Sequence, residues 1–215
     1  MDYMQIVNHY EACLSKHGDT HLGVDWPNAL DATVRYDVML GVIRDTQRCI
    51  SLLDFGCGAG HLLSHIQSRK LGQVSYTGID ISPKYIDLCK KKFVDGPKFM
   101  CVDILKNPPQ TVFDYVIANG VFTEKQDASF DDMFSYFRRM ITVLFSMSAI
   151  GIAFNVMSKQ VQWERDDLFH LSLGDVTDFI GAELSRHFVI RNDYGLYEYT
   201  VFLYKKPNYE TSYFM

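Results

Sequence analysis

LLDFGCGAGHLL, residues 52–63, is an apolar run, a turn with glycine at three alternate positions, and a second apolar run. This order is typical of a buried strand, a tight turn and a helix. Glycine permits positive φ and lets the backbone approach a ligand closely. In parallel α/β sheets, ligands bind where the strands end. Gly56, Gly58 and Gly60 therefore predict a ligand site; a glycine turn that binds nothing is the alternative interpretation.

The sequence after residue 50 alternates between short apolar runs and helical patterns. This alternation predicts βαβ units with right-handed crossovers and a mostly parallel sheet covered by helices on both faces. Two final strands are separated by a short turn, so they must pair antiparallel. The expected fold class is α/β, with seven strands of which the last is antiparallel. The strands are expected at 50–55, 73–80, 98–103, 113–119, 149–156, 187–193 and 198–206, and the intervening helices at 61–70, 83–93 and 129–145.

Helix start signals support these boundaries. Two helices are expected near 2–16 and 29–46, and Asn28 can cap the second. The expected caps of three later helices are Ser82, which precedes a proline, Ser129 and Asp175.

The same patterns divide the chain into three segments within one structural domain. Residues 1–48 are expected to form a helical lid, and residues 49–206 the ligand-binding core. Residues 207–215 are expected to be a flexible tail. The N-terminus has no basic region followed by an apolar one, so no signal peptide is expected.

Composition excludes several classes of partner. The net charge of −5 and the pI of about 5.8 disfavour a nucleic-acid binder, which normally presents a basic face. No apolar run approaches the length of a membrane span. The cysteines form no CxxC pair and their number is odd, so we expect reduced thiols, a cytoplasmic location, and neither disulfides nor a metal site. They are Cys13, Cys49, Cys57, Cys89 and Cys101.

The residue before the glycines indicates which ligand binds. Dinucleotide sites usually read GxGxxG, whereas this turn reads DxGxGxG and begins at Asp54. A carboxylate there would repel a pyrophosphate and favour a ligand that carries a sulfonium and an ammonium group. The turn resembles the first motif of the class I S-adenosylmethionine-dependent methyltransferases. The resemblance extends over residues 50–204 and implies a Rossmann-like fold with S-adenosylmethionine as cofactor.

A narrower similarity is to small bacterial methyltransferases of unassigned substrate. It rests on VDW near the N-terminus, GVF after the fourth strand, AFNV in the fifth, and DYGLYEYTVFLY near the end. It suggests the decorations of the fold and identifies no methyl acceptor.

Acidic residues at the strand ends fit this cofactor. Asp80, about 20 residues beyond the glycines, can accept hydrogen bonds from both ribose hydroxyls. The resemblance implies that an acid at Asp103 accepts from the adenine amino group while the backbone of Ile104 contacts the ring. It places Asn119 and Gly120 beside the sulfonium. The turn and the second strand contribute Asp54, Gly56, Cys57, Gly58, Gly60 and Ile81.

Three residues of the N-terminal segment are candidates for the same site. Trp26 can fold over the cofactor, or can anchor helix packing. Arg35 can meet the methionine carboxylate, although a salt bridge is the commoner fate of an arginine. Tyr10 can help to close the lid, with core packing as its alternative role.

His170 is the candidate catalytic residue. It follows the fifth strand, at a position that faces the acceptor in related folds, and histidine is the usual proton acceptor near neutral pH. A surface histidine without a catalytic role is the alternative.

These observations predict a methyltransferase that acts on an oxygen or nitrogen of a small molecule, such as a sugar or a secondary-metabolite intermediate. Enzymes that methylate planar amino groups typically carry [N/D]PP[Y/F] after the fourth strand. This chain has Asn-Gly-Val-Phe there, which disfavours nucleic acids as acceptors. A protein that binds the nucleoside without chemistry is an alternative, a nicotinamide-dependent oxidoreductase is a weaker one, and a homodimer is left open.

Overall fold

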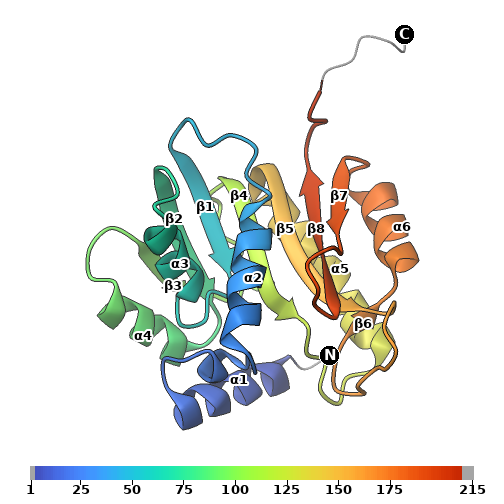
Figure 1. Cartoon of the computed structure of the whole chain (residues 1–215), viewed down its shortest axis with the longest axis horizontal. Helices are drawn as coiled ribbons and strands as arrows, with labels where there is room; N and C mark the ends of the chain where they lie inside the picture. The colour runs from blue at the N-terminus through green and yellow to red at the C-terminus, as the bar shows by residue number, and fades with distance from the viewer. Residues whose placement is uncertain (1–2, 210–215) are drawn as a thin grey trace.

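The computed structural model describes residues 3–209, which fold around one central sheet (Figure 1). Its strands run in the order β3-β2-β1-β4-β5-β8-β7, and β6 pairs with β5 off this path. The bounds are β1 (Ile50–Phe55), β2 (Val74–Asp80), β3 (Lys98–Cys101), β4 (Phe113–Phe122), β5 (Ser148–Ser158), β6 (His170–Leu171), β7 (Phe188–Arg191) and β8 (Glu198–Tyr204).

Strand directions confirm the expected fold class. The neighbours from β3 to β5 pair in parallel, and β8 is antiparallel to both β5 and β7. The sequence predicted the seven strands of the main path. It did not predict β6, because a strand of two residues has no periodicity to recognise.

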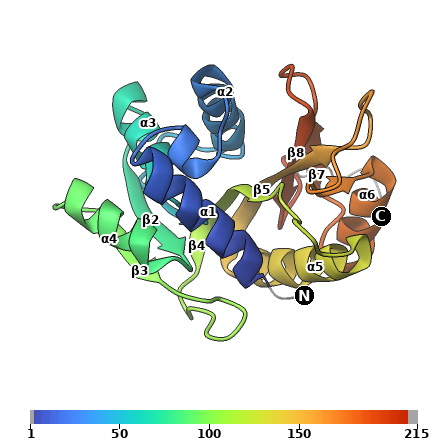
Figure 2. The same cartoon turned by 90° about the horizontal axis from the view of Figure 1, so that it is seen from below.

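Helices cover both faces of the sheet (Figure 2). Buried side chains of α2, α3 and α4 form one apolar cluster with the strands, and those of α5 and α6 form a second on the opposite face. This two-sided burial explains the nearly continuous apolar strands. The bounds are α1 (Met4–His17), α2 (Ala29–Leu40), α3 (His61–Arg69), α4 (Pro83–Lys92), α5 (Phe130–Ser146) and α6 (Leu173–Glu183), with a 3-10 turn, η1 (Leu22–Val24).

Three of the four expected helix caps are confirmed. The side chains of Asn28, Ser82 and Ser129 each accept a hydrogen bond from a backbone amide in the first turn of their helix. The prediction for Asp175 was wrong. Ser172 is the cap of α6, and it both accepts from the Asp175 amide (3.0 Å) and donates to the Asp175 carboxylate (2.6 Å). Asp175 is therefore the third residue of the helix, in a reciprocal capping arrangement.

Helix α2 ends at Leu40, six residues earlier than predicted. A Cβ at Gly41 would lie 2.9 Å from the Val38 carbonyl oxygen and 3.2 Å from the Phe202 ring. The chain turns there and then forms a polar loop, in which the Asp45 carboxylate accepts from the Gln47 amide. Glycine and this local hydrogen bond end the helix before its apolar spacing does.

Helix α1 lies across the carboxyl edge of the parallel strands, whereas α2 packs on one face of the sheet (Figures 1 and 2). Side chains from α4 and its cap hold α1 there. The Tyr85 hydroxyl donates to the carbonyl oxygens of Tyr10 (2.9 Å) and Gly23 (2.6 Å), and the Ser82 hydroxyl donates to Glu11 (2.6 Å). Residues 1–48 as a lid stay a prediction. Of the predicted tail, residues 210–215 lie outside the described residues. Within residues 3–209, no helix is both long and apolar enough to span a membrane.

Candidate functional site

The turn between β1 and α3 has the backbone that its glycines predict. Gly56 and Gly58 have φ angles of 70° and 49°, which residues with a Cβ rarely adopt. A Cβ on Gly56 would also lie 2.6 Å from a methyl carbon of Val121. The amides of Gly56 and Cys57 both donate to the Ile79 carbonyl, at 2.8 and 3.1 Å. The turn is thus fixed against the end of β2.

Gly60, the third glycine, serves the packing of helices. It precedes α3 with a φ of 70°, and a Cβ there would lie 2.7 Å from the Phe93 ring and 3.2 Å from the Cys89 sulfur. The structure does not bring it into the wall of the cavity described next. Gly60 therefore allows α3 and α4 to approach each other closely, and it does not line the cavity as the sequence predicted.

A cavity opens between the glycine turn and α1. Its empty volume, with the open mouth included, is about 1140 Å³. The cavity brings together most of the predicted site, from both the N-terminal segment and the strand ends. These residues are Tyr10, Trp26, Asp54, Gly56, Cys57, Gly58, Asp80, Ile81, Asp103, Ile104, Asn119 and Gly120.

Asp54 is a buried carboxyl in the cavity wall, with only 3% of its surface exposed. It accepts a hydrogen bond from the Tyr76 hydroxyl at 2.5 Å. Burial raises the pKa of Asp54 to about 7; the neighbouring charge of Asp80 acts in the same direction and the Tyr76 bond opposes it. A cationic ligand in this cavity would favour the ionised form.

Asp80 joins the glycine turn to the start of α4. One carboxylate oxygen accepts from the Gly58 amide and the other from the Ser82 amide, both at 2.9 Å. Burial raises the pKa of Asp80, and these backbone bonds act against that rise. Each oxygen keeps further acceptor capacity toward the cavity that it lines.

Asp103 connects the start of α1 to the end of β3. Its carboxylate accepts from the Tyr3 hydroxyl at 2.5 Å and pairs with the Lys106 ammonium at 3.1 Å. Burial acts to raise the pKa of Asp103, but the bonds from Tyr3 and Lys106 outweigh it and hold the pKa below its usual value. The adjacent Ile104 is buried in the same wall.

Asn119 and Gly120, near the end of β4, lie between the cavity and the N-terminal segment. The Asn119 side-chain oxygen is buried and, within residues 3–209, has no hydrogen-bond partner. Gly120 has a φ of 74°, and a Cβ there would lie 2.6 Å from the Trp26 ring. Its carbonyl accepts from the Tyr10 hydroxyl at 3.2 Å, and its amide donates to Asn155 at 2.7 Å. Trp26 and Tyr10 therefore both contact the backbone at this position.

Arg35 lies outside the cavity wall and has a different role from the one predicted. Its Nε contacts both carboxylate oxygens of Glu198, at 3.0 and 2.9 Å, and its guanidinium stacks on Trp26 at 4.0 Å. Glu198 is 1% exposed, and a buried carboxylate needs a counter-charge. Arg35 therefore neutralises Glu198 and supports Trp26, instead of reaching the cavity.

His170 is likewise not placed to act as the predicted base. It is buried in β6, where Nδ1 lies 2.7 Å from the Ser158 carbonyl oxygen and Nε2 accepts from the Arg165 amide at 3.3 Å. Both ring nitrogens are engaged by backbone, and the residue does not line the cavity. Its position after β5 suggested the acceptor side, but the short strand directs the ring into the protein.

The cavity wall also contains residues that were not predicted, mainly the tyrosines Tyr3, Tyr85 and Tyr136. Tyr36 of α2 and His61 at the start of α3 line it as well, and the His61 Nε2 lies 2.7 Å from an Asp19 carboxylate. Burial lowers the pKa of His61, against the effect of Asp19. The tyrosines are in or beside helices, where helical spacing alone cannot separate a cavity wall from a core. The end of a strand is a clearer positional signal.

Known proteins resemble this chain in sequence and fold. A family model described as a methyltransferase domain matches residues 47–168, more than half of the chain. Rv1506c of Mycobacterium tuberculosis (strain ATCC 25618 / H37Rv), whose name assigns it provisionally to the methyltransferases, is 27% identical over 159 residues. That match covers 72% of this chain and 93% of Rv1506c.

Two further proteins extend the comparison. The malonyl-acyl-carrier-protein O-methyltransferase of Priestia megaterium is 32% identical over 74 residues, which are 34% of this chain and 27% of that enzyme. The crystal structure of magnesium protoporphyrin IX methyltransferase from Synechocystis PCC 6803, with bound SAM, superposes with a TM-score of 0.68 at 18% identity. It covers 96% of this chain and 98% of that one, a likeness of fold.

Proposed function

Because the chain belongs to the class I S-adenosylmethionine-dependent methyltransferases, we propose that it methylates an oxygen or nitrogen atom of a small molecule. The observation that carries the proposal is the cavity, where a glycine turn, three carboxyls and an unpartnered amide oxygen meet at the carboxyl ends of the strands. An oxygen acceptor has additional support from the Priestia megaterium relative, which is an O-methyltransferase.

The residues of the wall fit S-adenosylmethionine. The glycine turn leaves room for the methionine part beside the backbone of residues 56–58, and Asp80 accepts from the ribose hydroxyls. Asp103 and the backbone of Ile104 hold the adenine. The unpartnered oxygen of Asn119 accepts from a donor group of the ligand, which removes the cost of about 1–3 kcal/mol of leaving that oxygen unpaired.

The chemistry then needs alignment more than proton transfer. When bound, S-adenosylmethionine supplies a methyl group already activated on a sulfonium, so the protein has to align the acceptor and exclude water. Trp26 covers Gly120, and Tyr10 bonds to its carbonyl. These two side chains close the cavity on the side of β4 where the acceptor enters. An ionised Asp54 favours the cationic donor over its neutral thioether product.

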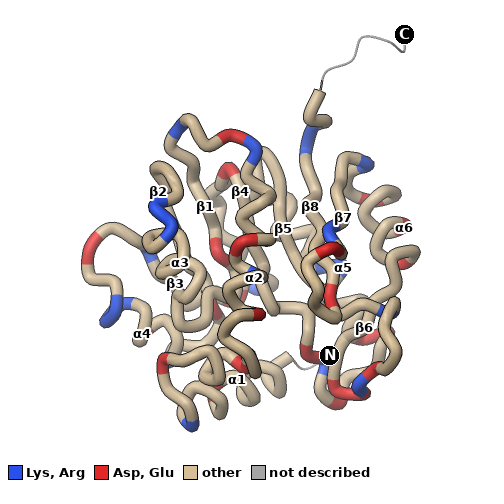
Figure 3. Tube along the Cα trace, viewed as in Figure 1, with Lys and Arg blue, Asp and Glu red and all other residues tan. Residues whose placement is uncertain are grey.

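The charge distribution supports a small acceptor. Lys and Arg segments are scattered over the molecule and do not gather along the edge where α1 lies (Figure 3). A nucleic acid would require a basic face at that edge. We place the reaction in the cytoplasm, because all five cysteines are unpaired thiols and a reducing compartment keeps them so.

Methyl transfer from labelled cofactor tests the proposal. The protein is incubated with S-adenosylmethionine carrying a labelled methyl group and with metabolite extracts from several bacteria. We expect label in a small-molecule product, and at least a tenfold lower rate for Asn119→Ala. The matched control Asn107→Ala alters an exposed asparagine and keeps the wild-type rate. If no extract is labelled although S-adenosylhomocysteine binds, the chain is a binding protein without this chemistry.

A further inference from the structure

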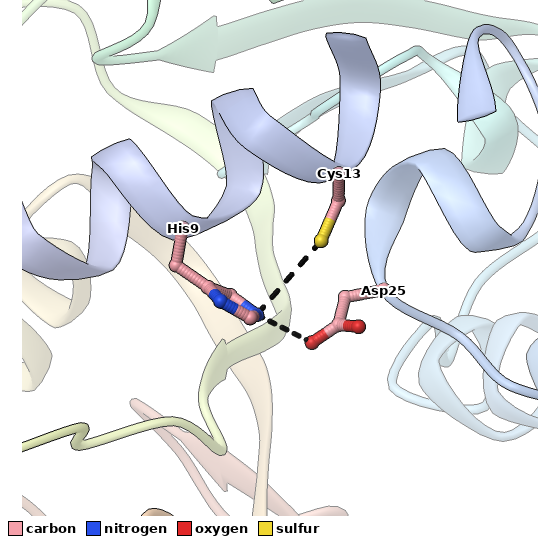
Figure 4. Close-up of side chains that lie close together, drawn as sticks. All are labelled: His9, Cys13 and Asp25. Atoms are coloured by element: carbon pink, nitrogen blue, oxygen red, sulfur yellow. Dashed lines mark hydrogen bonds and ion pairs between the residues drawn. The ribbon is translucent and has the colours of Figure 1, made fainter. Parts of the chain in front are cut away.

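Three potential metal ligands meet beside the cavity, between α1 and the loop that leads to α2. His9 and Cys13 are four residues apart on α1, so they lie on the same face of the helix. Asp25, at the end of η1, points toward them (Figure 4). The His9 Nε2, the Cys13 sulfur and an Asp25 carboxylate oxygen all lie within 4.8 Å of one another. We propose that these residues form a binding site for a divalent cation of the zinc class.

The distances are close to those of a metal site. His9 Nε2 lies 2.8 Å from the Asp25 carboxylate and 3.9 Å from the Cys13 sulfur. Zinc bonds of about 2.0–2.1 Å to nitrogen or oxygen and about 2.3 Å to sulfur place tetrahedral ligand atoms roughly 3.3–3.6 Å apart. To bind zinc, the His9 nitrogen and the Asp25 oxygen must move apart by about half an ångström, and the His9 nitrogen and the Cys13 sulfur must move closer by slightly less. The His9 and Asp25 side chains are 34% and 36% exposed, which leaves room for that adjustment and a path for the ion.

The chemical types of the three ligands indicate which ion would bind. Imidazole, thiolate and carboxylate together suit a borderline-soft ion such as Zn²⁺, whereas Mg²⁺ and Ca²⁺ prefer oxygen ligands alone. Three protein ligands leave a fourth tetrahedral position open, as in catalytic zinc sites. On binding, the Cys13 thiol gives its proton to solvent, and the thiolate and carboxylate charges balance the dication.

The surroundings favour a cation. Glu124, 7% exposed, is close enough to Asp25 and His9 for their charges to act on it. Burial raises the pKa of Glu124 to about 7, and Asp25 adds to that rise. Two acidic groups therefore lie near one histidine, and a bound dication would offset their negative charge.

The site lies next to the cavity wall without being part of it. His9 is followed by Tyr10 and Asp25 by Trp26, the two side chains that contact Gly120 in that wall, whereas His9, Cys13 and Asp25 do not line the cavity. An ion held by both α1 and the loop that leads to α2 would therefore tie these two segments together beside the proposed acceptor site.

Cobalt and zinc binding test the site without measuring any methyl transfer. Chelator-treated protein without an affinity tag is titrated with Co²⁺, and Zn²⁺ affinity is measured by competition with a chromogenic chelator. We expect one ion per chain, a thiolate-to-cobalt charge-transfer band, and tetrahedral d–d absorption. Cys13→Ser is expected to abolish the charge-transfer band. His9→Gln is expected to weaken Zn²⁺ binding at least tenfold, since even ligand-supporting groups contribute ~10–100-fold.

Controls separate this site from adventitious binding. Cys101→Ser removes an exposed thiol elsewhere and should leave the spectrum and affinity unchanged. Circular dichroism checks that each variant is folded, and the two ligand variants give independent readouts. The proposal is overturned if the wild type shows no thiolate band, or if both ligand variants bind Zn²⁺ as tightly as the wild type. In that case the His9–Asp25 contact is a hydrogen bond without a metal role. Either result leaves the methyltransferase proposal standing, because that rests on the cavity.

Discussion

At the residue scale, ionising the buried Asp54 carboxyl lowers the free energy of unfolding by an amount that can be measured. Its folded-state pKa of about 7 lies above its ordinary value of 3.8, so between these values the folded protein binds more protons than the unfolded chain. The protonated Asp54 carboxyl contributes fully to the free energy of unfolding below pH ~4, and this contribution is lost as the pH rises through 7. From pH 5 to 7 the wild type should lose about 2 kcal/mol relative to Asp54→Asn, measured by urea unfolding of the ligand-free proteins.

The asparagine at position 54 can still accept the bond from Tyr76, so the comparison isolates the charge. Groups elsewhere, including Glu124, titrate in both proteins and cancel in the difference. Parallel stability curves across this pH range would show that Asp54 is ionised in the folded protein without penalty, contrary to its burial.

Site residues could be predicted from the sequence where they lie near the end of a strand. Asp54, Asp80 and Asp103 could be predicted because each lies at or within two residues of the end of a strand, and parallel strands end along one edge of the sheet. Arg35 and His170 could not be assigned correctly, because their partners, Glu198 and the Ser158 carbonyl, are distant in sequence or depend on the path of an irregular loop. A long-range partner leaves no signal in a single sequence.

At the element scale, the contact between Trp26 and Gly120 holds the N-terminal segment on the core. Gly120→Ala places a Cβ against the Trp26 ring at a positive φ. We expect it to lower the free energy of unfolding by about 1–3 kcal/mol and to expose Trp26, which raises the rate at which proteases cleave before residue 48. Urea unfolding and limited proteolysis measure the two effects.

Gly181→Ala is the matched control, because Gly181 lies in α6 with open space at the Cβ position. It should raise stability by roughly 0.5–1 kcal/mol through helix propensity. If Gly120→Ala behaves like Gly181→Ala, then Trp26 does not press on Gly120, and the N-terminal segment is held by other contacts.

Elements were more predictable than their ends. The strands and helices of the core could be read from periodicity because both sheet faces are buried. The end of α2 was predicted too late, because Gly41 follows the helix although the apolar spacing continues beyond it. The cap of α6 was assigned to Asp175 instead of Ser172, because both are residue types that cap helices. β6 depends on pairing with β5 and has no pattern of its own.

At the scale of the whole molecule, topology brings the site together. The chain order places β1 beside both β2 and β4, so the glycine turn, Asp80 and Asn119 meet although they are up to 63 residues apart. The N-terminal segment then covers this edge and brings His9, Cys13 and Asp25 beside it. The sequence predicted the first group from the fold pattern. It could not predict the second, which depends on how α1 docks, and homodimer formation stays a prediction.

Calorimetric titration with S-adenosylhomocysteine tests the central claim most directly, because it requires no knowledge of the acceptor. We predict one-to-one binding to the wild type, no binding of NAD, and at least a tenfold loss of affinity in Asp80→Ala. Asp87→Ala, which changes an exposed acid on α4, should bind as the wild type does. Binding of NAD in place of S-adenosylhomocysteine, or wild-type affinity in Asp80→Ala, would contradict the account.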